Sequence, residues 1–258
     1  MSGAPSPAVV CGDGVPSPEI ERIARLCRAE AWSRASYFEL DTPARDQLLD
    51  RRVILFTSDV GKERLEPALS PPVAYCLEAG QPPDGVVLGA LDSWRRSLAL
   101  TLSARSTYVF RAGGAFVEAL ARRGAVVESI RPRVELALSE ALANAVIHGS
   151  AELGSPAEGT RDAWRDHASV LRDRLADDRF GGRPVTVQSA WAGGNLSLSV
   201  SDRGKGFNPP DASPQRASSG LHGRGLTFIH NSADRVTFDE GGRRITLEFT
   251  DTPTEASA

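Results

Sequence analysis

A helical stretch over residues 134–148 carries three polar side chains along one line of a largely apolar helix. Glu140, Asn144 and His148 are four residues apart, so they share one helix face, and Gly149 is placed to end the helix in a left-handed conformation. Polar groups on so apolar a helix need partners. The functional interpretation is that Asn144 offers its amide oxygen to a hard cation such as magnesium, with Glu140 facing the same cation. The alternatives are an exposed helix face and, for His148, a structural role at the helix end.

A second polar group ends a strand. The strands over residues 184–191 and 195–202 are joined by a hairpin signal, and alternate residues of the second are apolar. Asp202 continues that parity, so it lies on the core-facing side, where a carboxylate must find donors such as an adenine amino group. Gly204 and Gly206 then allow close backbone approach and positive φ. The alternative is an ordinary Asp-x-Gly turn.

A third group is a glycine-rich run over residues 220–226 that opens a short helix. Backbone N–H groups of such a loop, at the N-terminus of a helix, can bind an anion. Arg224, between Gly223 and Gly225, could meet a phosphate or remain solvated. Each of the three groups is weak alone, and their order along the chain is the informative feature.

In this order, an E-x-x-x-N helix, a hairpin ending in D-x-G-x-G-F and a G-x-G-L helix start resemble the N, G1 and G2 boxes of the GHKL ATPases. That superfamily includes gyrase, heat-shock chaperones and histidine kinases. The resemblance covers residues 98–249 and implies an α/β (α+β) sandwich of the Bergerat type, a mixed sheet with helices on one face that holds ATP and one magnesium ion. Residues 136–149 look most like the anti-sigma-factor serine/threonine kinases, whose glutamate stands four residues before the asparagine.

Carried over by position, the resemblance implies a role for each site residue. Asn144 would bind magnesium, Glu140 would be the general base that accepts the substrate hydroxyl proton, and Asp202 would bind the adenine amino group. Phosphoryl transfer needs mainly positioning and charge neutralisation, which such residues supply. The other residues that would form the nucleotide site are Gly204, Gly206, Phe207, Gly223, Arg224, Gly225 and Leu226.

The implied function is an ATP-dependent serine/threonine protein kinase in a bacterial partner-switching pathway. Its substrate would be a serine on an antagonist protein, a sigma factor would be a second partner, and relatives of this type are commonly homodimers. One alternative is an ATP-binding regulatory module that sequesters a sigma factor or another regulator without phosphotransfer. Another is the catalytic domain of a split histidine kinase, although the chain has no H-[DE]-x-x-x-P phosphoacceptor pattern.

Composition limits the other possibilities. The 258 residues carry a formal net charge of −3, and the basic pairs are isolated, so nothing favours a nucleic-acid partner. No apolar run approaches a membrane helix, and the N-terminus lacks the pattern of a signal peptide. The three cysteines have neither the number nor the spacing of a disulfide framework or a zinc site. We therefore expect a cytoplasmic protein without membrane or nucleic-acid contacts.

The organisation predicted along the chain has four parts. Residues 1–18 are rich in Pro, Gly and Ser and are predicted to be a disordered tail. Residues 19–95 are predicted to form a small α/β domain, residues 96–251 the ATPase domain, and residues 252–258 a second tail. The small domain is of unknown role.

Two apolar runs within the small domain, over residues 53–57 and 86–91, are predicted to be strands. With their flanking residues, the runs over 53–59 and 83–91 weakly resemble two strands of a response-regulator receiver. Gly89 stands where the phosphoacceptor aspartate of a receiver would be, so no phosphorylation is assigned to this part.

Overall fold

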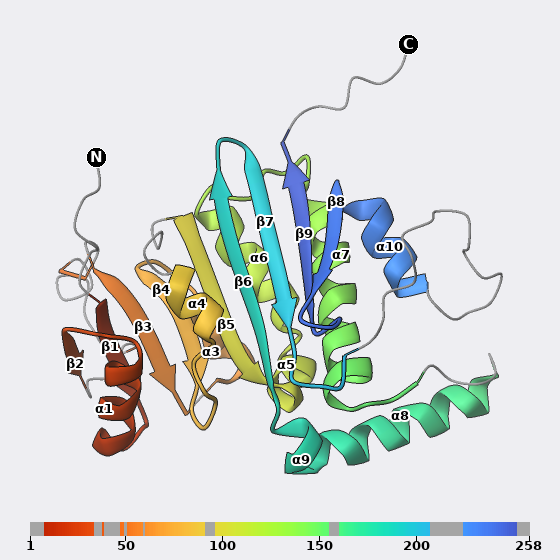
Figure 1. The fold of residues 1–258 in the computed structure, drawn as a ribbon, viewed down its shortest axis with the longest axis horizontal. Coiled ribbons are helices and arrows are strands. Elements are labelled where there is room, and N and C mark those ends of the chain that lie inside the picture. The colour runs from red at the N-terminus through yellow and green to blue at the C-terminus, as the bar shows by residue number, and fades with distance from the viewer. Residues whose placement is uncertain are drawn as a thin grey trace.

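In the computed structural model, nine strands of the described residues form one mixed sheet in the order β2-β1-β3-β4-β5-β6-β7-β9-β8 (Figure 1). The structure describes residues 8–33, 38, 47–48, 51–58, 60–90, 96–154, 160–206 and 224–251. The strands are β1 (Ala8–Asp13), β2 (Ala31–Ser33), β3 (Arg52–Thr57), β4 (Val73–Glu78), β5 (Ser97–Ser103), β6 (Pro184–Ala192), β7 (Asn195–Ser201), β8 (Arg235–Asp239) and β9 (Arg244–Thr250).

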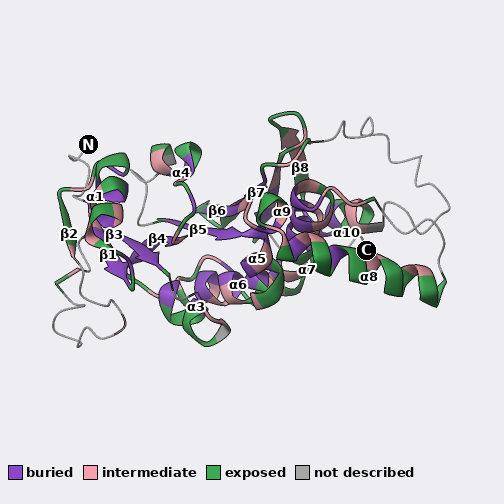
Figure 2. Cartoon of the chain, turned by 90° about the horizontal axis from the view of Figure 1, so that it is seen from below, coloured by how far each residue is buried: buried purple, intermediate pink, exposed green. Residues whose placement is uncertain are grey.

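The first five strands pair with one another in parallel, in the order 2-1-3-4-5 that flavodoxin-like folds also have. Their connections carry helices α1 (Ser17–Leu26), α3 (Lys62–Ala68) and α4 (Gly85–Ala90). Helices α1 and α4 lie on one face of the sheet, whereas α3 lies on the other (Figure 2). Of the two runs that resemble receiver strands, the first contains most of strand β3, whereas the second lies mostly in helix α4, so Gly89 is not at a strand end.

Two predictions in this half are wrong. Residues 8–13, assigned to a disordered tail, form the buried strand β1 between β2 and β3, because a short apolar run stands inside the Pro- and Gly-rich segment. Residues 86–91, predicted to be a strand, belong mostly to helix α4. Periodicity cannot separate a buried strand from a helix in so short an apolar run. Here the side chain of Asp84 decides, since its Oδ1 accepts hydrogen bonds from the first N–H groups of the helix, those of Val86 (2.8 Å) and Val87 (3.2 Å).

Strands β5 to β9 form the antiparallel half, and among the described residues helices α5 (Ala104–Phe110), α6 (Ala112–Arg122) and α7 (Arg131–Asn144) pack on one of its faces. The mixed sheet with helices on one face confirms the fold expected for residues 96–251. The other helices of this half are a π-helix (Ala145–Ser150), α8 (Arg161–Ala176), α9 (Asp178–Gly181) and α10 (Arg224–Ser232).

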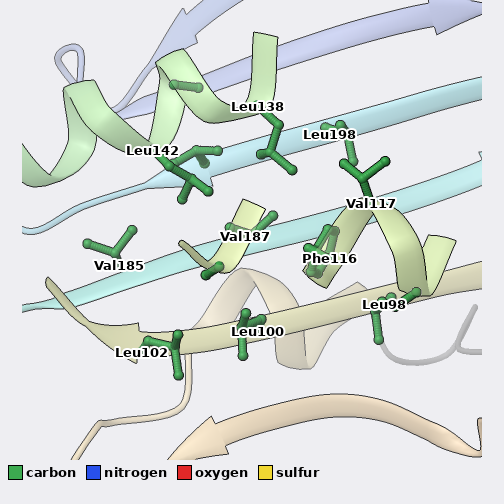
Figure 3. Packing of buried hydrophobic residues seen from close by; sticks show 14 of the residues in the cluster. Leu98, Leu100, Leu102, Phe116, Val117, Leu138, Leu142, Val185, Val187 and Leu198 are labelled. Carbon is green, nitrogen blue, oxygen red and sulfur yellow. The ribbon is translucent and has the colours of Figure 1, made fainter. Parts of the chain in front are cut away.

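Helix α7 is oriented by its apolar face. Its buried residues Val134, Ala137, Leu138, Ala141 and Leu142 follow the spacing of one helix face and pack on the sheet. Figure 3 shows Leu138 and Leu142 above the leucines of β5, among side chains of α6, β6 and β7. Burying one such leucine contributes roughly 1.5–3 kcal/mol. Because this face is buried in the core, a different face of α7 contacts α10, which packs beside it.

The sheet is continuous across residue 95, where the sequence predicts a division between two domains. Strand β4 pairs with β5 in parallel, with Tyr75 opposite Ala99 and Leu77 opposite Thr101. The Tyr75 hydroxyl also lies 2.8 Å from the Thr101 hydroxyl. The two-domain division stays a prediction, but the two halves share a sheet and side-chain contacts. Within the described ranges, no helix is long and apolar enough to cross a membrane.

Candidate functional site

Glu140 and Asn144 face the start of helix α10. A Cβ atom added to Gly225 would lie 2.9 Å from Glu140 Oε2 and 3.5 Å from Asn144 Oδ1. Both side chains are half-buried, and among the described residues neither forms a hydrogen bond or ion pair. The structure therefore brings the first and third predicted groups together, and the missing side chain of Gly225 leaves room for this approach.

Helix α10 presents its positive end to these oxygens. The helix begins at Arg224, and its first N–H groups have no partner within the helix. Ile229 is buried and Leu226 packs against the core, so α10 is held to the domain by its apolar side. A carboxylate, an amide oxygen and the N-terminus of a helix thus meet at one place, an arrangement that suits a phosphate group with a bound hard cation.

Asp202 lies just beyond β7 on the core-facing side, as predicted, and is 9% exposed. Its backbone N–H donates to the Arg243 carbonyl (3.0 Å), and its Oδ1 accepts from the Gly204 N–H (2.7 Å). Burial raises the pKa of the Asp202 carboxyl to about 6, although the Gly204 N–H and the nearby Arg243 act in the opposite direction. A buried carboxylate with one fixed hydrogen bond keeps acceptor capacity for a ligand donor.

Gly149 and Gly204 let two backbones interlock beside this carboxylate. A Cβ atom on Gly149 would lie 2.6 Å from Asp202 Oδ2, and one on Gly204 would collide with the Gly149 carbonyl. The expected left-handed conformation of Gly149 is wrong, because the residue lies inside the π-helix and has no positive φ. This glycine is needed for the space it leaves at Asp202. The π-helix that follows α7 and the loop after β7 therefore meet at van der Waals distance.

The loop over residues 202–206 is also held by charged side chains. Lys205 Nζ lies 2.8 Å from Glu152, whose other oxygen lies 2.8 Å from Arg183. These two cations hold the pKa of the Glu152 carboxyl below its usual range. Gly206 has a φ of 73°, and a Cβ atom there would collide with the Gly241 carbonyl of the last hairpin.

The sequence did not single out Glu152 or Gly241, because both act through contacts with residues distant along the chain. His148 is exposed, and its Nδ1 lies 2.6 Å from the Leu153 carbonyl, which is a structural contact. Phe207 and Gly223 lie outside the described residues, as does the side chain of Arg224.

Comparison with known proteins adds one finding. A family model described as a histidine kinase-like ATPase domain matches residues 102–249, which are more than half of the chain. No curated protein matches the chain. The matched region contains Glu140, Asn144, Asp202 and Gly225.

The contact between Gly149 and Asp202 gives a first prediction. Gly149→Ala places a methyl group against the Asp202 carboxylate, so either that carboxylate or its loop must move. We expect the Kd for Mg-ATP, measured by isothermal titration calorimetry, to rise at least about tenfold. Gly114→Ala is the matched control, because nothing lies within 4 Å of its added methyl group in helix α6. Equal affinities for the two variants would contradict the proposed interlock.

The buried carboxylate of Asp202 gives a second prediction. Burial raises its pKa from 3.8 to about 6, so the folded chain binds this proton more tightly than the unfolded chain. The contribution of Asp202 to stability should therefore fall as the pH rises from about 4 to about 6 and then stay constant.

Urea unfolding at a series of pH values, with Asp202→Asn as the non-titrating variant, checks the sign. The unfolding free energy of Asp202→Asn relative to wild type should grow by up to about 3 kcal/mol across that interval. A difference that is independent of pH, or that grows toward acid, would show that the carboxylate is not buried as described.

Proposed function

The chain belongs to the histidine kinase-like ATPase family, and on this premise we propose that it is an ATP-dependent serine/threonine protein kinase of the anti-sigma-factor type. The phosphate would pass to a serine of an antagonist protein in bacterial partner switching, with a sigma factor as a second partner. The observation that carries the proposal is the Glu140 carboxylate beside Asn144 at the N-terminus of α10. A family member that only bound ATP would not need a carboxylate at that point.

The residues present fit a magnesium ion and its phosphates. The Asn144 amide oxygen is a hard ligand, and magnesium commonly completes its shell with phosphate oxygens and water. Among the described residues, no group of three or more His, Cys, Asp or Glu gathers as a metal site, so the phosphates would have to supply ligands. When bound, the ion would neutralise charge on the transferred phosphoryl group. The N–H groups at the start of α10, with Gly223, Arg224 and Gly225, would hold the phosphates.

The adenine would lie at the other end of the site. The Asp202 carboxylate would accept a hydrogen bond from the adenine amino group, as donors are the partners a buried carboxylate requires. Gly204 and Gly206 would allow the loop backbone to approach the nucleotide closely. Phe207 and Leu226 would supply apolar contacts, and Leu226 already packs against the core.

Glu140 would act as the general base. The serine hydroxyl oxygen attacks the γ-phosphorus, its proton passes to the Glu140 carboxylate, and the bond from the γ-phosphorus to the bridging β–γ oxygen breaks to release ADP. Glu140 lies one helical turn before Asn144, so the proton acceptor and the magnesium ligand would face the same phosphate. No phosphoenzyme is required in this scheme.

Phosphotransfer by paired variants tests the proposal. The tagged chain captures its partner from native cells, the complex receives Mg-ATP, and phosphorylated sites are mapped. We expect phosphoserine on the captured protein with wild type and an at least about 100-fold slower transfer with Glu140→Gln, whose Kd for Mg-ATP stays within about threefold. Glu135→Gln is the matched control, since Glu135 lies on the same helix but pairs with Arg131 (2.9 Å).

Three outcomes would contradict the kinase assignment. Normal transfer by Glu140→Gln would remove Glu140 as the base. A tight complex without phosphoserine would favour an ATP-controlled module that sequesters its partner, and phosphohistidine on the partner would favour a split histidine kinase.

A further inference from the structure

Asp84 is a buried carboxylate that lies outside the ATPase family match. It belongs to the segment between β4 and α4, in the half of the chain for which the sequence predicts no role, and its side chain is 7% exposed. Its Oδ1 caps helix α4, and its backbone N–H donates to the Tyr75 hydroxyl (3.2 Å). The Tyr75 hydroxyl is hydrogen-bonded to the Thr101 hydroxyl (2.8 Å), which is hydrogen-bonded in turn to the Thr186 hydroxyl (2.8 Å). These contacts hold Asp84 firmly against the sheet face opposite α7.

Two arginines from the nucleotide-site region reach this carboxylate. Arg203 Nη2 lies 3.9 Å from Asp84 Oδ2, and Arg244 Nη2 lies 3.8 Å from Asp84 Oδ1. Arg244 is 10% exposed and is further held by Glu240 (3.0 Å), whereas Arg203 is mostly exposed. The Asp84 carboxylate therefore lies near two cationic side chains, one just after the end of β7 and one at the start of β9.

These two arginines flank the backbone bond that fixes Asp202. The Asp202 N–H donates to the Arg243 carbonyl, Arg203 follows Asp202, and Arg244 follows Arg243. Because both arginines lie within 4 Å of one carboxylate, Asp84 is placed to attract the two chain segments toward each other at this bond. On the helix side, the Lys205–Glu152 ion pair holds the same loop from the opposite direction.

We propose that Asp84 is a positioning residue for the adenine-binding loop, through which the N-terminal half of the chain sets the affinity for ATP. The inference rests on the proposed nucleotide site but not on phosphotransfer. Asp84 does not touch the nucleotide. It acts by holding Arg203 and Arg244, and these arginines fix the orientation of Asp202. Because binding linkage is reciprocal, a ligand that displaces the segment around Asp84 would weaken ATP binding, and ATP would oppose that displacement.

Asp84→Asn tests this role while keeping the helix cap, since an asparagine oxygen also accepts from helix N–H groups. Arg244 retains Glu240, so no buried cation is left alone. We expect the Kd of the full-length chain for Mg-ATP to rise about five- to twentyfold. The ratio of the Kd for Mg-GTP to the Kd for Mg-ATP should also fall, because a displaced Asp202 no longer accepts a hydrogen bond from the adenine amino group.

Asp13→Asn is the matched control. Asp13 is an equally buried carboxylate at the end of β1 in the same half of the chain, where it pairs with Arg64 (3.6 Å) and Thr57 (3.2 Å). Its loss should lower the melting temperature but leave ATP affinity and the ATP/GTP ratio unchanged. A double-mutant cycle of Asp84→Asn with Arg203→Gln should be non-additive in ATP affinity, as expected for residues that act through one contact.

The outcomes separate this inference from the kinase assignment. If wild type binds Mg-ATP and Asp84→Asn binds it within about twofold, the positioning role is wrong and the kinase proposal is unaffected. If Asp84→Asn weakens binding no more than Asp13→Asn does, the effect is general destabilisation and the positioning role is also wrong. If ATP binds as expected but no phosphotransfer occurs, only the kinase proposal fails. Failure of wild type to bind Mg-ATP would overturn both.

Discussion

Everything at the site depends on the approach of the Gly149 backbone to the Asp202 carboxylate. The contact joins the end of the α7 segment to the end of β7, and it is possible only because Gly149 and Gly204 lack side chains. Once these ends are joined, the remaining distances follow from rigid elements. Asn144 lies about one turn and Glu140 about two turns before Gly149, and α10 packs beside them. The same contact buries Asp202, which accounts for its raised pKa.

The sheet links this site to the rest of the chain. Strand β5 is buried along its whole length because it pairs with β4 on one side and β6 on the other. The parallel strands are therefore in direct contact with the ATPase half, and their loops reach the nucleotide-site region from the face opposite α7. Asp84 lies in one of these loops, between β4 and α4, and its carboxylate faces two arginines and not solvent.

Local pattern predicted the positions of Glu140, Asn144 and Asp202 in the fold better than it predicted the first half of the chain. The polar spacing on α7 and the strand parity that places Asp202 toward the core are periodic signals, so both could be seen in the sequence. Residues 8–13 were misassigned because composition around them outweighed a short apolar run. Helix α4 was misassigned because its cap, Asp84, precedes a run with no helical period. The role of Gly149 depends on a contact with Asp202, and no local pattern reports such a contact.

The central claim is that three distant segments form a single magnesium-ATP site with Asn144 as the protein ligand of the ion. Thermal unfolding of wild type and Asn144→Ala, each with ATP in the presence and absence of magnesium, tests it most directly. Ligand at 100 times its Kd stabilises a folded protein by about 2.7 kcal/mol. The account predicts that magnesium adds to the stabilisation of wild type by ATP but not to that of Asn144→Ala, while magnesium-free ATP stabilises both equally. Equal stabilisation of the two proteins by Mg-ATP would contradict it.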